Sequence, residues 1–381
     1  MLDGAGILTF ANDWTADPTS KHHVMKRFSE THDVLWIETA GMRAPKLGSV
    51  YDQRRIIAKA RSMVRSVRRV EDRIHVLSPP ALPYPNSSVA EAVNSVLYNA
   101  TIRRALQSLE VAGDPNIFVF APHCARRIRR LPRRFLTYYC VDRWGAFQGY
   151  DRDTMEAGER ELCERADLVL ASAQDLAERC ARYSDNVHYM PHGVDHDHFA
   201  TALEARALPD DIADIPEPRV GFFGLIHEWV DIDLIGRLAD ALPYSFVLIG
   251  STSEDLSQLT ARKNVFHLGR RPFATLPDYS RGFQAALVPF RLTELTASVN
   301  PIKLQEYAAA GLPVVSSDLP EVRREEQIAT CVKSFDDWVG AVENAVRQGS
   351  DQEFRRRQSD LVREKDWAYV CERIAGLVND G

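Results

Sequence analysis

The stretch from residue 285 to residue 317 constrains the fold more than any other part of the chain. It reads as an apolar strand, a polar loop, a helix, a glycine stop and a second strand, which predicts one right-handed βαβ crossover of a parallel sheet. We expect Asn300 to cap the helix and Pro301 to begin it, where a missing N–H has no cost. The first turn of a helix attracts anions, and Lys303 and Glu306 lie near it on one face. This helix can therefore offer a cation to a diphosphate and a carboxylate to sugar hydroxyls.

The run NPIKLQEYAAAGLPVV, residues 300–315, resembles the signature of bacterial group 1 nucleotide-sugar glycosyltransferases with the GT-B fold. The resemblance implies an α/β architecture of two Rossmann-like, doubly wound domains that face each other across a cleft. It also implies that the donor diphosphate lies at the helix start near Lys303 and that Glu306 bonds the ribose. The residues alone leave one alternative open, which is a Rossmann-like helix whose Lys and Glu form an exposed pair.

Length and composition favour two domains, because a chain of 381 residues exceeds one usual core. The predicted division is an acceptor-binding domain over 1–198, a linker over 199–218, a nucleotide-sugar-binding domain over 219–360 and a terminal helix over 361–381 that braces the first domain. The sequence contains neither a signal peptide nor an apolar run of about 18 residues, so we expect a cytoplasmic protein. Six cysteines without paired spacing predict reduced thiols and no zinc site.

Charge is distributed unevenly along the chain. Residues 1–150 hold 22 Lys and Arg against 13 Asp and Glu, although the whole chain has a net charge of −6. The basic residues form two groups, which are Arg54, Arg55, Lys59, Arg61, Arg65, Arg68, Arg69 and Arg73, and then Arg126, Arg127, Arg129, Arg130, Arg133 and Arg134. The first group has apolar residues between its charges, a pattern that predicts an amphipathic helix on an anionic membrane surface. A plain solvated face is the alternative, and nucleic acid is not expected because no aromatic interleaving accompanies the arginines.

The first predicted strand, 6–11, leads into a polar loop and then a helix over 21–29 that Ser20 is expected to cap. Loops at the carboxyl ends of parallel strands face the ligand in doubly wound folds. Contact with the acceptor is therefore predicted for Asp13, Trp14, Ser20 and His22. The alternative, of equal weight, is that Trp14 and Asp17 only pack and cap the loop.

Two further polar side chains follow the strands predicted at 116–121 and 135–141. His123 follows the first strand and Asp142 the second, so both lie at one edge of the sheet. A histidine and an aspartate delivered in this way are candidates for acid/base catalysis or for orienting a substrate. Asp142 also resembles an aspartate of related bacterial enzymes in the run YYCVDRW, whereas a lone histidine at a strand end is more often structural.

The strand predicted at 219–223 opens the second domain. In the family that the chain resembles, the loop after this strand carries an arginine and then a lysine that grip the donor diphosphate. Here Leu225 stands in place of the arginine, which shifts this task to Lys303 and to backbone N–H groups. The loop after the strand at 264–269 is implied to cradle the nucleotide base. The predicted donor-binding residues are Gly224, His227, Glu228, Gly269, Arg270, Arg271, Ser298, Asn300, Lys303 and Glu306.

Two acidic clusters imitate metal sites. Residues 195–198 alternate Asp and His, but this spacing puts neighbours on opposite sides of any regular structure. Asp231 and Asp233 open a predicted helix, so helix capping and dipole matching explain them better. No metal or cofactor is therefore expected.

These features imply transfer of a hexosyl group from a nucleoside diphosphate sugar to an acceptor hydroxyl. Lys303 would stabilise the charge that grows on the leaving diphosphate, and Asp142 and His123 are the other catalytic candidates. The resemblance favours retention of configuration, although retaining relatives carry a glutamate where this chain has Ser298. The acceptor is expected to be a lipid-linked or polysaccharide precursor. A nucleotide-sugar epimerase and a non-catalytic, sugar-nucleotide-binding scaffold of a polysaccharide assembly complex are the alternatives.

Overall fold

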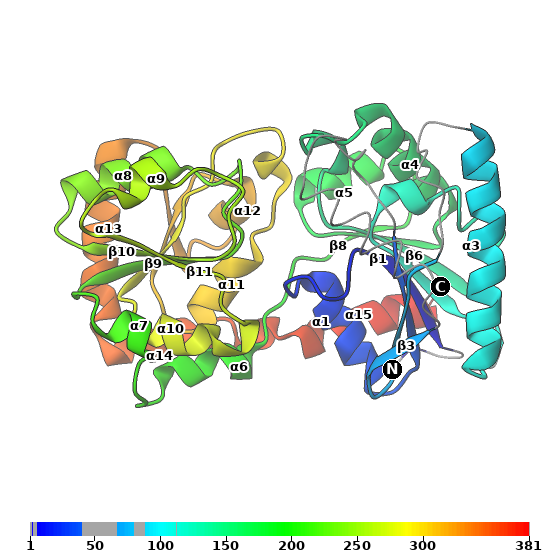
Figure 1. Cartoon of the computed structure of the whole chain (residues 1–381), viewed down its shortest axis with the longest axis horizontal. Coiled ribbons are helices and arrows are strands. Elements are labelled where there is room, and N and C mark those ends of the chain that lie inside the picture. The colour runs from blue at the N-terminus through cyan, green and yellow to red at the C-terminus, as the bar shows by residue number, and fades with distance from the viewer. Residues whose placement is uncertain (1, 3–5, 40–66, 80–87, 112, 381) are drawn as a thin grey trace. The chain divides into compact units, whose positions relative to one another are not determined.

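The computed structural model describes residues 2, 6–39, 67–79, 88–111 and 113–380 of the chain (Figure 1). The chain divides into two compact units: unit 1 comprises residues 1–191 and 371–381, and unit 2 comprises residues 192–370. The residues expected to form a linker, 199–218, lie inside unit 2 and contribute to α6 (His196–Ala200), η3 (Thr201–Leu203) and α7 (Asp210–Ala213). The last helix, α15 (Trp367–Asp380), belongs to unit 1 from residue 371 onward.

Unit 1 is organised around a sheet with the strand order β3-β4-β2-β1-β5-β6-β7-β8 (Figure 1). The strands are β1 (Ile7–Ala11), β2 (Val34–Glu38), β3 (Arg68–Glu71), β4 (Ile74–Leu77), β5 (Asn116–Val119), β6 (Phe135–Cys140), β7 (Leu168–Ala171) and β8 (Val187–Tyr189). Neighbours are parallel except β3 and β4. The central strands β1, β5, β6 and β7 are buried throughout, as is typical of parallel sheets. The longer helices are α1 (Ser20–Ser29), α3 (Ser88–Ser108), α4 (Arg152–Arg165) and α5 (Gln174–Cys180).

The first basic group does not form a helix where the structure describes it. Arg68 and Arg69 lie in β3, where Arg68 pairs with Val76 of the antiparallel strand β4. The predicted amphipathic helix is therefore wrong at this end, because pairing with β4 overrides the helical spacing of the apolar residues. The remaining members up to residue 65 lie outside the described residues; they are Arg54, Arg55, Lys59, Arg61 and Arg65.

Unit 2 is built on a sheet with the order β11-β10-β9-β12-β13-β14, in which all neighbouring strands are parallel. The strands are β9 (Arg219–Phe223), β10 (Ser245–Ile249), β11 (Val265–Gly269), β12 (Ala285–Val288), β13 (Val314–Ser317) and β14 (Ala329–Val332). The helices are α8 (Ile232–Ala241), α9 (Ser257–Thr260), α10 (Leu276–Arg281), α11 (Ile302–Ala309), α12 (Pro320–Arg323), α13 (Phe335–Gly349) and α14 (Gln352–Asp360). The predicted crossover at 285–317 is confirmed as β12, α11 and β13.

Two helix starts differ from the prediction by one residue. Pro301 occupies the cap position of α11, and the side-chain amide of Asn300 donates instead to a carboxylate oxygen of Glu321 at 3.4 Å. Thr19 caps α1, so Ser20 is the first helical residue. At α11 the Asn300 side chain is engaged by Glu321, and at α1 the cap position is taken by Thr19. The preference of a single residue for the cap position does not reveal either contact.

The strand order reverses once in each sheet, between β1 and β5 in unit 1 and between β9 and β12 in unit 2. Ligands of open α/β sheets bind at such switch points, beyond the carboxyl ends of the strands. The loops that follow these strands therefore mark one candidate region in each unit. None of the helices in the described ranges combines the length and the apolar character needed to cross a bilayer.

Candidate functional site

Lys303 lies directly on the backbone of Gly224 in unit 2. A Cβ atom added to Gly224 would come within 1.7 Å of Cε of Lys303, and the φ angle of this glycine is +132°. Only glycine combines that backbone angle with so close an approach. The lysine of α11 and the end of β9 thus form one surface, as the predicted donor-binding roles of both residues require.

Glu306 is the buried acid of this surface. Its side chain is 6% exposed, and its carboxylate receives no hydrogen bond from the part of the chain that the structure describes. Burial raises the pKa of Glu306 to about 7, the charge of Lys303 opposes this rise, and the charge of Asp195 adds to it. A buried carboxylate without a hydrogen bond is costly to keep, so this position is suited to a ligand that donates hydroxyl groups.

Tyr307 fixes α11 against β9. Its hydroxyl accepts a hydrogen bond from the backbone N–H of Phe223 at 2.8 Å and donates to the Phe223 carbonyl at 3.3 Å. The two aromatic rings also meet edge to face, with centroids 4.5 Å apart. Tyr307 therefore positions Lys303 and Glu306 relative to the strand end. Sequence reasoning missed this role because nothing in the helix pattern distinguishes Tyr307 from an ordinary core residue.

The loop after Gly224 is held by β10 and carries the predicted His227 and Glu228. The backbone N–H of Ile226 donates to the carbonyl of Ser251 at 2.9 Å. The His227 ring stacks on Trp229 with centroids 4.6 Å apart, and its buried Nδ1 atom has no hydrogen-bond partner among the described residues. Glu228 is partly buried in the same loop. The loop therefore offers one imidazole nitrogen for a ligand contact.

Ser298 and Asn300 precede α11 in the loop after β12. Ser298 is fully buried at the end of η5 (Thr296–Ser298), where a larger acidic side chain would have to displace its neighbours. Asn300 is engaged by Glu321, as described above. Both residues therefore lie just before the start of α11. The side chain of Asn300, however, is hydrogen-bonded to Glu321 of α12.

The three residues predicted for base binding have different environments. Gly269 has a φ angle of +71° and ends β11, and Arg270 is exposed. Arg271 forms an ion pair with Asp211 at 2.5 Å and donates to the hydroxyl of Tyr279 at 2.8 Å. The Arg271 side chain therefore braces α7 and α10, which leaves the backbone near Gly269 as the candidate for a base contact.

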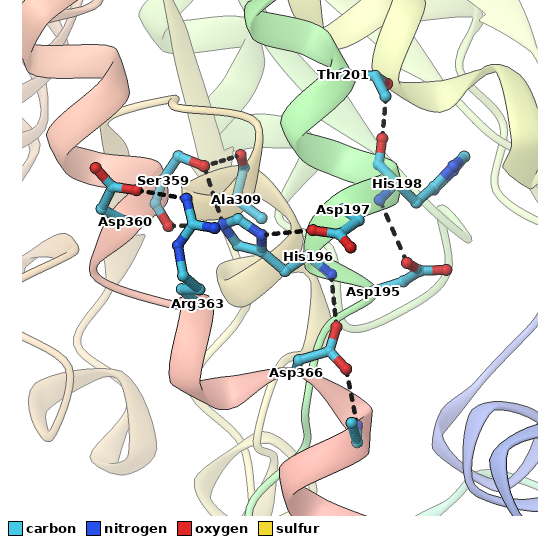
Figure 2. Close-up of polar contacts among 11 residues, drawn as sticks. Asp195, His196, Asp197, His198, Thr201, Ala309, Ser359, Asp360, Arg363 and Asp366 are labelled. Atoms are coloured by element: carbon cyan, nitrogen blue, oxygen red, sulfur yellow. Dashed lines mark hydrogen bonds and ion pairs between the residues drawn. The ribbon is translucent and has the colours of Figure 1, made fainter.

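The Asp and His cluster at 195–198 holds unit 2 together around α14. Figure 2 shows that Nε2 of His196 faces the carbonyl of Ser359, at 3.1 Å, while the backbone N–H of His196 donates to Asp366 at 3.1 Å. Asp195 caps α6 by accepting from the backbone N–H of His198 at 3.3 Å. Nδ1 of His196 lies 3.5 Å from the Asp197 carboxylate, and Nε2 of His198 lies 3.1 Å from the carbonyl of Phe273, so the cluster makes structural contacts within unit 2.

Asp231 likewise has the structural role expected for it. Its carboxylate caps α8 by accepting from the backbone N–H of Leu234 at 3.1 Å. Arg291 lies 3.5 Å from the Asp231 carboxylate and 3.0 Å from that of Asp233. The predicted capping role is confirmed for Asp231, and Asp233 lies in the first turn of α8, where the helix dipole favours an acid.

In unit 1, the loop after β1 is built from its own predicted contact residues. The rings of Trp14, His22 and Trp36 form a cluster with centroid distances of 4.8 to 5.2 Å. Burial, assisted by the charge of Lys21, lowers the pKa of His22 to about 3, so this imidazole is neutral near pH 7. Asp13 accepts from the N–H and hydroxyl of Thr15 at 2.8 and 2.7 Å. Trp14, His22 and Asp13 thus contribute to the conformation of the loop, and Ser20 is buried in the first turn of α1.

His123 and Asp142 follow adjacent strands of the unit 1 sheet. His123 lies in η1 (Pro122–Cys124) after β5, with Nε2 3.6 Å from Sγ of Cys124. Asp142 is partly buried after β6 and receives no hydrogen bond on its carboxylate from the described residues. Burial raises the pKa of Asp142 to about 6, and the charge of Lys21 opposes the rise. Asp142 is therefore the stronger candidate of the two for contact with a substrate.

Lys21 is the residue of this region that sequence reasoning overlooked. It is only 7% exposed, although lysines are almost never buried without a partner. Its Nζ atom lies 5.6 Å from the ring centroid of Trp144, and burial lowers its pKa while the charge of Asp142 opposes that change. Its position between the two predicted residues Ser20 and His22 was a signal that could have identified it.

Comparison with known proteins identifies relatives of unit 2 and of the whole fold. Residues 217–348 match the family model described as glycosyl transferases group 1. The chain is 25% identical over 262 residues to a Bacillus subtilis (strain 168) protein named provisionally as the teichuronic acid biosynthesis glycosyltransferase TuaH. That alignment covers 62% of this chain and 65% of the relative.

Solved structures share the fold over nearly the whole chain. Sucrose-phosphate synthase from Thermosynechococcus elongatus has a TM-score of 0.71 at 13% identity, with 98% of each chain covered. The Anabaena protein HepE, solved with UDP and glucose, has a TM-score of 0.68 at 13% identity and covers 99% of this chain and all of its own. An E. coli trehalose-6-phosphate protein bound with UDP-2-fluoro glucose has a TM-score of 0.68 at 12% identity, covering 98% and 99% of the two chains. The chain therefore has the GT-B fold with two parallel sheets, and its residues 217–348 are similar to the group 1 glycosyltransferases.

Proposed function

We propose that the protein transfers a hexosyl group from a nucleoside diphosphate sugar to a hydroxyl group of a saccharide acceptor. The observation that carries this proposal is the placement of Lys303 against Gly224 at the switch point of unit 2, with Glu306 one turn along α11. The first turn of α11 and Lys303 suit a diphosphate. The buried carboxylate of Glu306 suits the hydroxyls of a ribose. The UDP and glucose bound to HepE support the same class of donor.

The chemistry of the transfer assigns a task to Lys303. The bond between the anomeric carbon and the phosphate oxygen breaks, and its electron pair leaves with the nucleoside diphosphate. The acceptor oxygen bonds to the anomeric carbon, and its proton passes to the phosphate oxygen that leaves with the nucleoside diphosphate. Lys303 lies where the leaving group gains charge, so its ammonium stabilises the transition state. Because Lys303 and backbone N–H groups supply this positive charge, the proposal includes no metal, and activity that survives excess EDTA tests this point.

Retention of configuration is the stereochemical part of the proposal. Retention is the outcome that the family resemblance favours, and Asp142 then orients the acceptor hydroxyl instead of acting as an obligatory base. Proton NMR of the freshly formed glycosidic product gives the anomeric configuration directly. An inverted product would assign Asp142 the role of general base.

The proposed acceptor is a lipid-linked or polysaccharide precursor at the cytoplasmic face of a membrane. Three apolar side chains of α3 are at least 39% exposed, and they are Val93, Val96 and Leu97. Arg103 and Arg104 follow two turns later on that face and are exposed. The Arg103 guanidinium donates to the carbonyl of Arg130 at 3.0 Å, which places this face beside the second basic group. Exposed apolar residues flanked by arginines suit an anionic bilayer.

Vesicle sedimentation tests this surface. The wild type is expected to sediment with phosphatidylglycerol vesicles and not with phosphatidylcholine vesicles. The variant Arg103→Glu/Arg104→Glu should lose most of this binding. Arg356→Glu/Arg357→Glu on α14 makes the same charge change at exposed residues of unit 2 and should retain it. Equal binding by the two double variants would remove α3 from the proposal.

A donor screen tests the transferase activity itself. Purified protein is supplied with UDP-, GDP- and dTDP-sugars, and release of nucleoside diphosphate is followed for the wild type, Lys303→Ala and Lys263→Ala. Lys263 is an exposed lysine of the same unit and serves as the matched control. Release from one donor that Lys303→Ala abolishes and Lys263→Ala preserves supports the proposal.

A non-catalytic scaffold is the second candidate, and two positions favour it. Ser298 and Leu225 stand where relatives are expected to carry charged residues, and Leu225 is 43% exposed without offering a charge. A scaffold would bind the sugar nucleotide in calorimetry and release no diphosphate from it. The donor screen therefore separates this candidate from the transferase.

A further inference from the structure

We propose that Lys21 and Asp142 together bind a vicinal diol of the acceptor, with the Lys21 ammonium donating to one hydroxyl oxygen and the Asp142 carboxylate accepting from the neighbouring hydroxyl. This inference rests on the proposed function, because it names the part of the acceptor that unit 1 recognises. It adds a residue, Lys21, for which no role in the reaction has been assigned.

The position of Lys21 has no explanation in the stability of α1. Lys21 lies in the first turn of this ten-residue helix, where the helix dipole disfavours a cation, and that turn contains no acidic residue. Its side chain is 7% exposed. Among the described residues it has no hydrogen bond and no ion pair within 4 Å, and its contacts are the ring of Trp144 and the charge of Asp142. A desolvated ammonium group in this state lacks the hydrogen bonds that water would provide.

The carboxylate of Asp142 likewise lacks hydrogen bonds from the described residues. The Asp142 side chain is partly buried after β6. The two charged groups act on each other electrostatically without closing to an ion pair within 4 Å. Of the neighbouring titratable groups on α1, His22 is neutral near pH 7, so it adds no second cation to the pair. Nζ of Lys21 lies 5.6 Å from the ring centroid of Trp144, and the backbone N–H of Trp144 donates to the Asp142 carbonyl at 3.0 Å. The structure therefore holds a donor and an acceptor in one region, each with unused hydrogen-bonding capacity among the described residues.

The charges of this pair select the class of ligand. An anionic ligand would be attracted by Lys21 and repelled by Asp142, whereas a cationic ligand would be attracted by Asp142 and repelled by Lys21. A neutral diol satisfies both groups at once, since one of its oxygens accepts from the ammonium and one of its hydroxyls donates to the carboxylate. Both hydrogen bonds are charge-assisted, which makes them stronger than those between neutral groups. A saccharide hydroxyl pair is such a ligand.

Calorimetric titration with methyl glycosides tests the inference on the full chain. The probes are the methyl α-glycosides of glucose, galactose, mannose and N-acetylglucosamine, and the variants are Lys21→Met, Asp142→Asn and Lys26→Met. Lys26 lies on the same helix, is 47% exposed and pairs with Glu71, so it is the matched control. At least one glycoside should bind the wild type, and Lys21→Met and Asp142→Asn should each weaken it at least tenfold while Lys26→Met changes it less than twofold. Binding to no glycoside, or equal binding by Lys21→Met and Lys26→Met, overturns the inference.

Two further measurements separate a contact role from a structural one. The Asp142 carboxyl signal in carbon-13 NMR should titrate at higher pH in Lys21→Met than in the wild type, because the variant lacks the positive charge that opposes the rise in pKa. Donor hydrolysis into water should be the same in Lys26→Met and the wild type, because Lys26 lies outside the proposed diol site. A protein that hydrolyses no donor fails the proposed function, whereas the glycoside titration decides the diol site in either case.

Discussion

The candidate region of each unit combines a lysine with a carboxyl group whose pKa is raised by burial, and the two pairs are assembled differently. In unit 2, Lys303 and Glu306 lie one turn apart on α11, and burial raises the pKa of Glu306 to about 7. In unit 1, Lys21 comes from α1 and Asp142 follows β6, and burial raises the pKa of Asp142 to about 6. Helical spacing therefore produces the pair in unit 2, whereas packing between segments distant in the sequence produces the pair in unit 1.

The difference teaches which kind of site a sequence can reveal. Residues at positions i and i+3 of a helix share a face wherever that helix packs, so helical spacing alone is enough to pair Lys303 with Glu306. Lys21 and Asp142 meet only because β1 and β6 belong to one sheet, with β5 between them, and α1 follows β1. Such a pair leaves no periodic trace in the sequence.

The largest expected effect separates the two lysines by function. Lys303→Ala should lower donor turnover into water by about 10²–10³, because it removes a preorganised donor to the leaving group. Lys21→Met should leave this rate unchanged. Initial rates of nucleoside diphosphate release, measured without acceptor, check both variants. Equal losses in the two would show that the lysines do not serve separate substrates.

Gly224→Ala tests the support beneath Lys303. The added Cβ would lie 1.7 Å from Cε of Lys303 and would force a φ angle of +132° on a residue with a side chain. The strain should cost about 1–3 kcal/mol of stability, and donor affinity should fall as Lys303 is displaced. Gly340→Ala is the control, because no atom lies within 4 Å of its added Cβ. Thermal unfolding and donor calorimetry give the two readouts, and donor affinity equal to the wild type would contradict this role for Gly224.

Glu306→Gln tests the cost of the buried acid in unit 2. The pKa of Glu306 is raised to about 7 on folding, so the folded state binds the proton more tightly than the unfolded state does. Stability contributed by this group is therefore lost as pH rises from about 4.3 through 7. At pH 8 the variant should be more stable than the wild type by about 1–3 kcal/mol, although it binds donor more weakly.

The pH dependence provides the control for this prediction. Below about pH 5 the wild-type carboxyl is protonated in the folded state, and the difference in the free energy of unfolding should shrink. Denaturant titrations at pH 5 and pH 8 measure it. A stability difference that is the same at both values would mean that Glu306 carries no such penalty.

Arg271→Ala should have the smallest effect. Its ion pair with Asp211 is roughly one-third exposed, and such pairs contribute less than about 1 kcal/mol. Donor affinity should stay within a factor of two, because the guanidinium is directed at α7 and α10. Donor calorimetry on Arg271→Ala and Arg270→Ala checks this directly. A tenfold loss for Arg271→Ala would restore it to the base-binding set.

Several parts of the fold were predictable because they depend on local chemistry. The βαβ unit at 285–317 follows from apolar strands on either side of a helix that ends at Gly311, where the φ angle is +76°. Helix starts were predicted less accurately. Asn300 and Ser20 are good caps in isolation, but Glu321 engages Asn300 and Thr19 takes the cap of α1. The helical prediction for Arg68 and Arg69 failed because strand pairing is not local.

The sequence by itself determined the fold class, the switch-point helix and the pairing of Lys303 with Glu306, since each depends on residues close together in the chain. Only the tertiary structure decided that Lys303 rests on Gly224, that Tyr307 locks α11 to Phe223, and that Lys21 is buried beside Asp142. Those contacts depend on how strands distant in sequence order themselves in a sheet. Burial, which sets the pKa of both carboxyl groups, is a property of that packing and not of the residues alone.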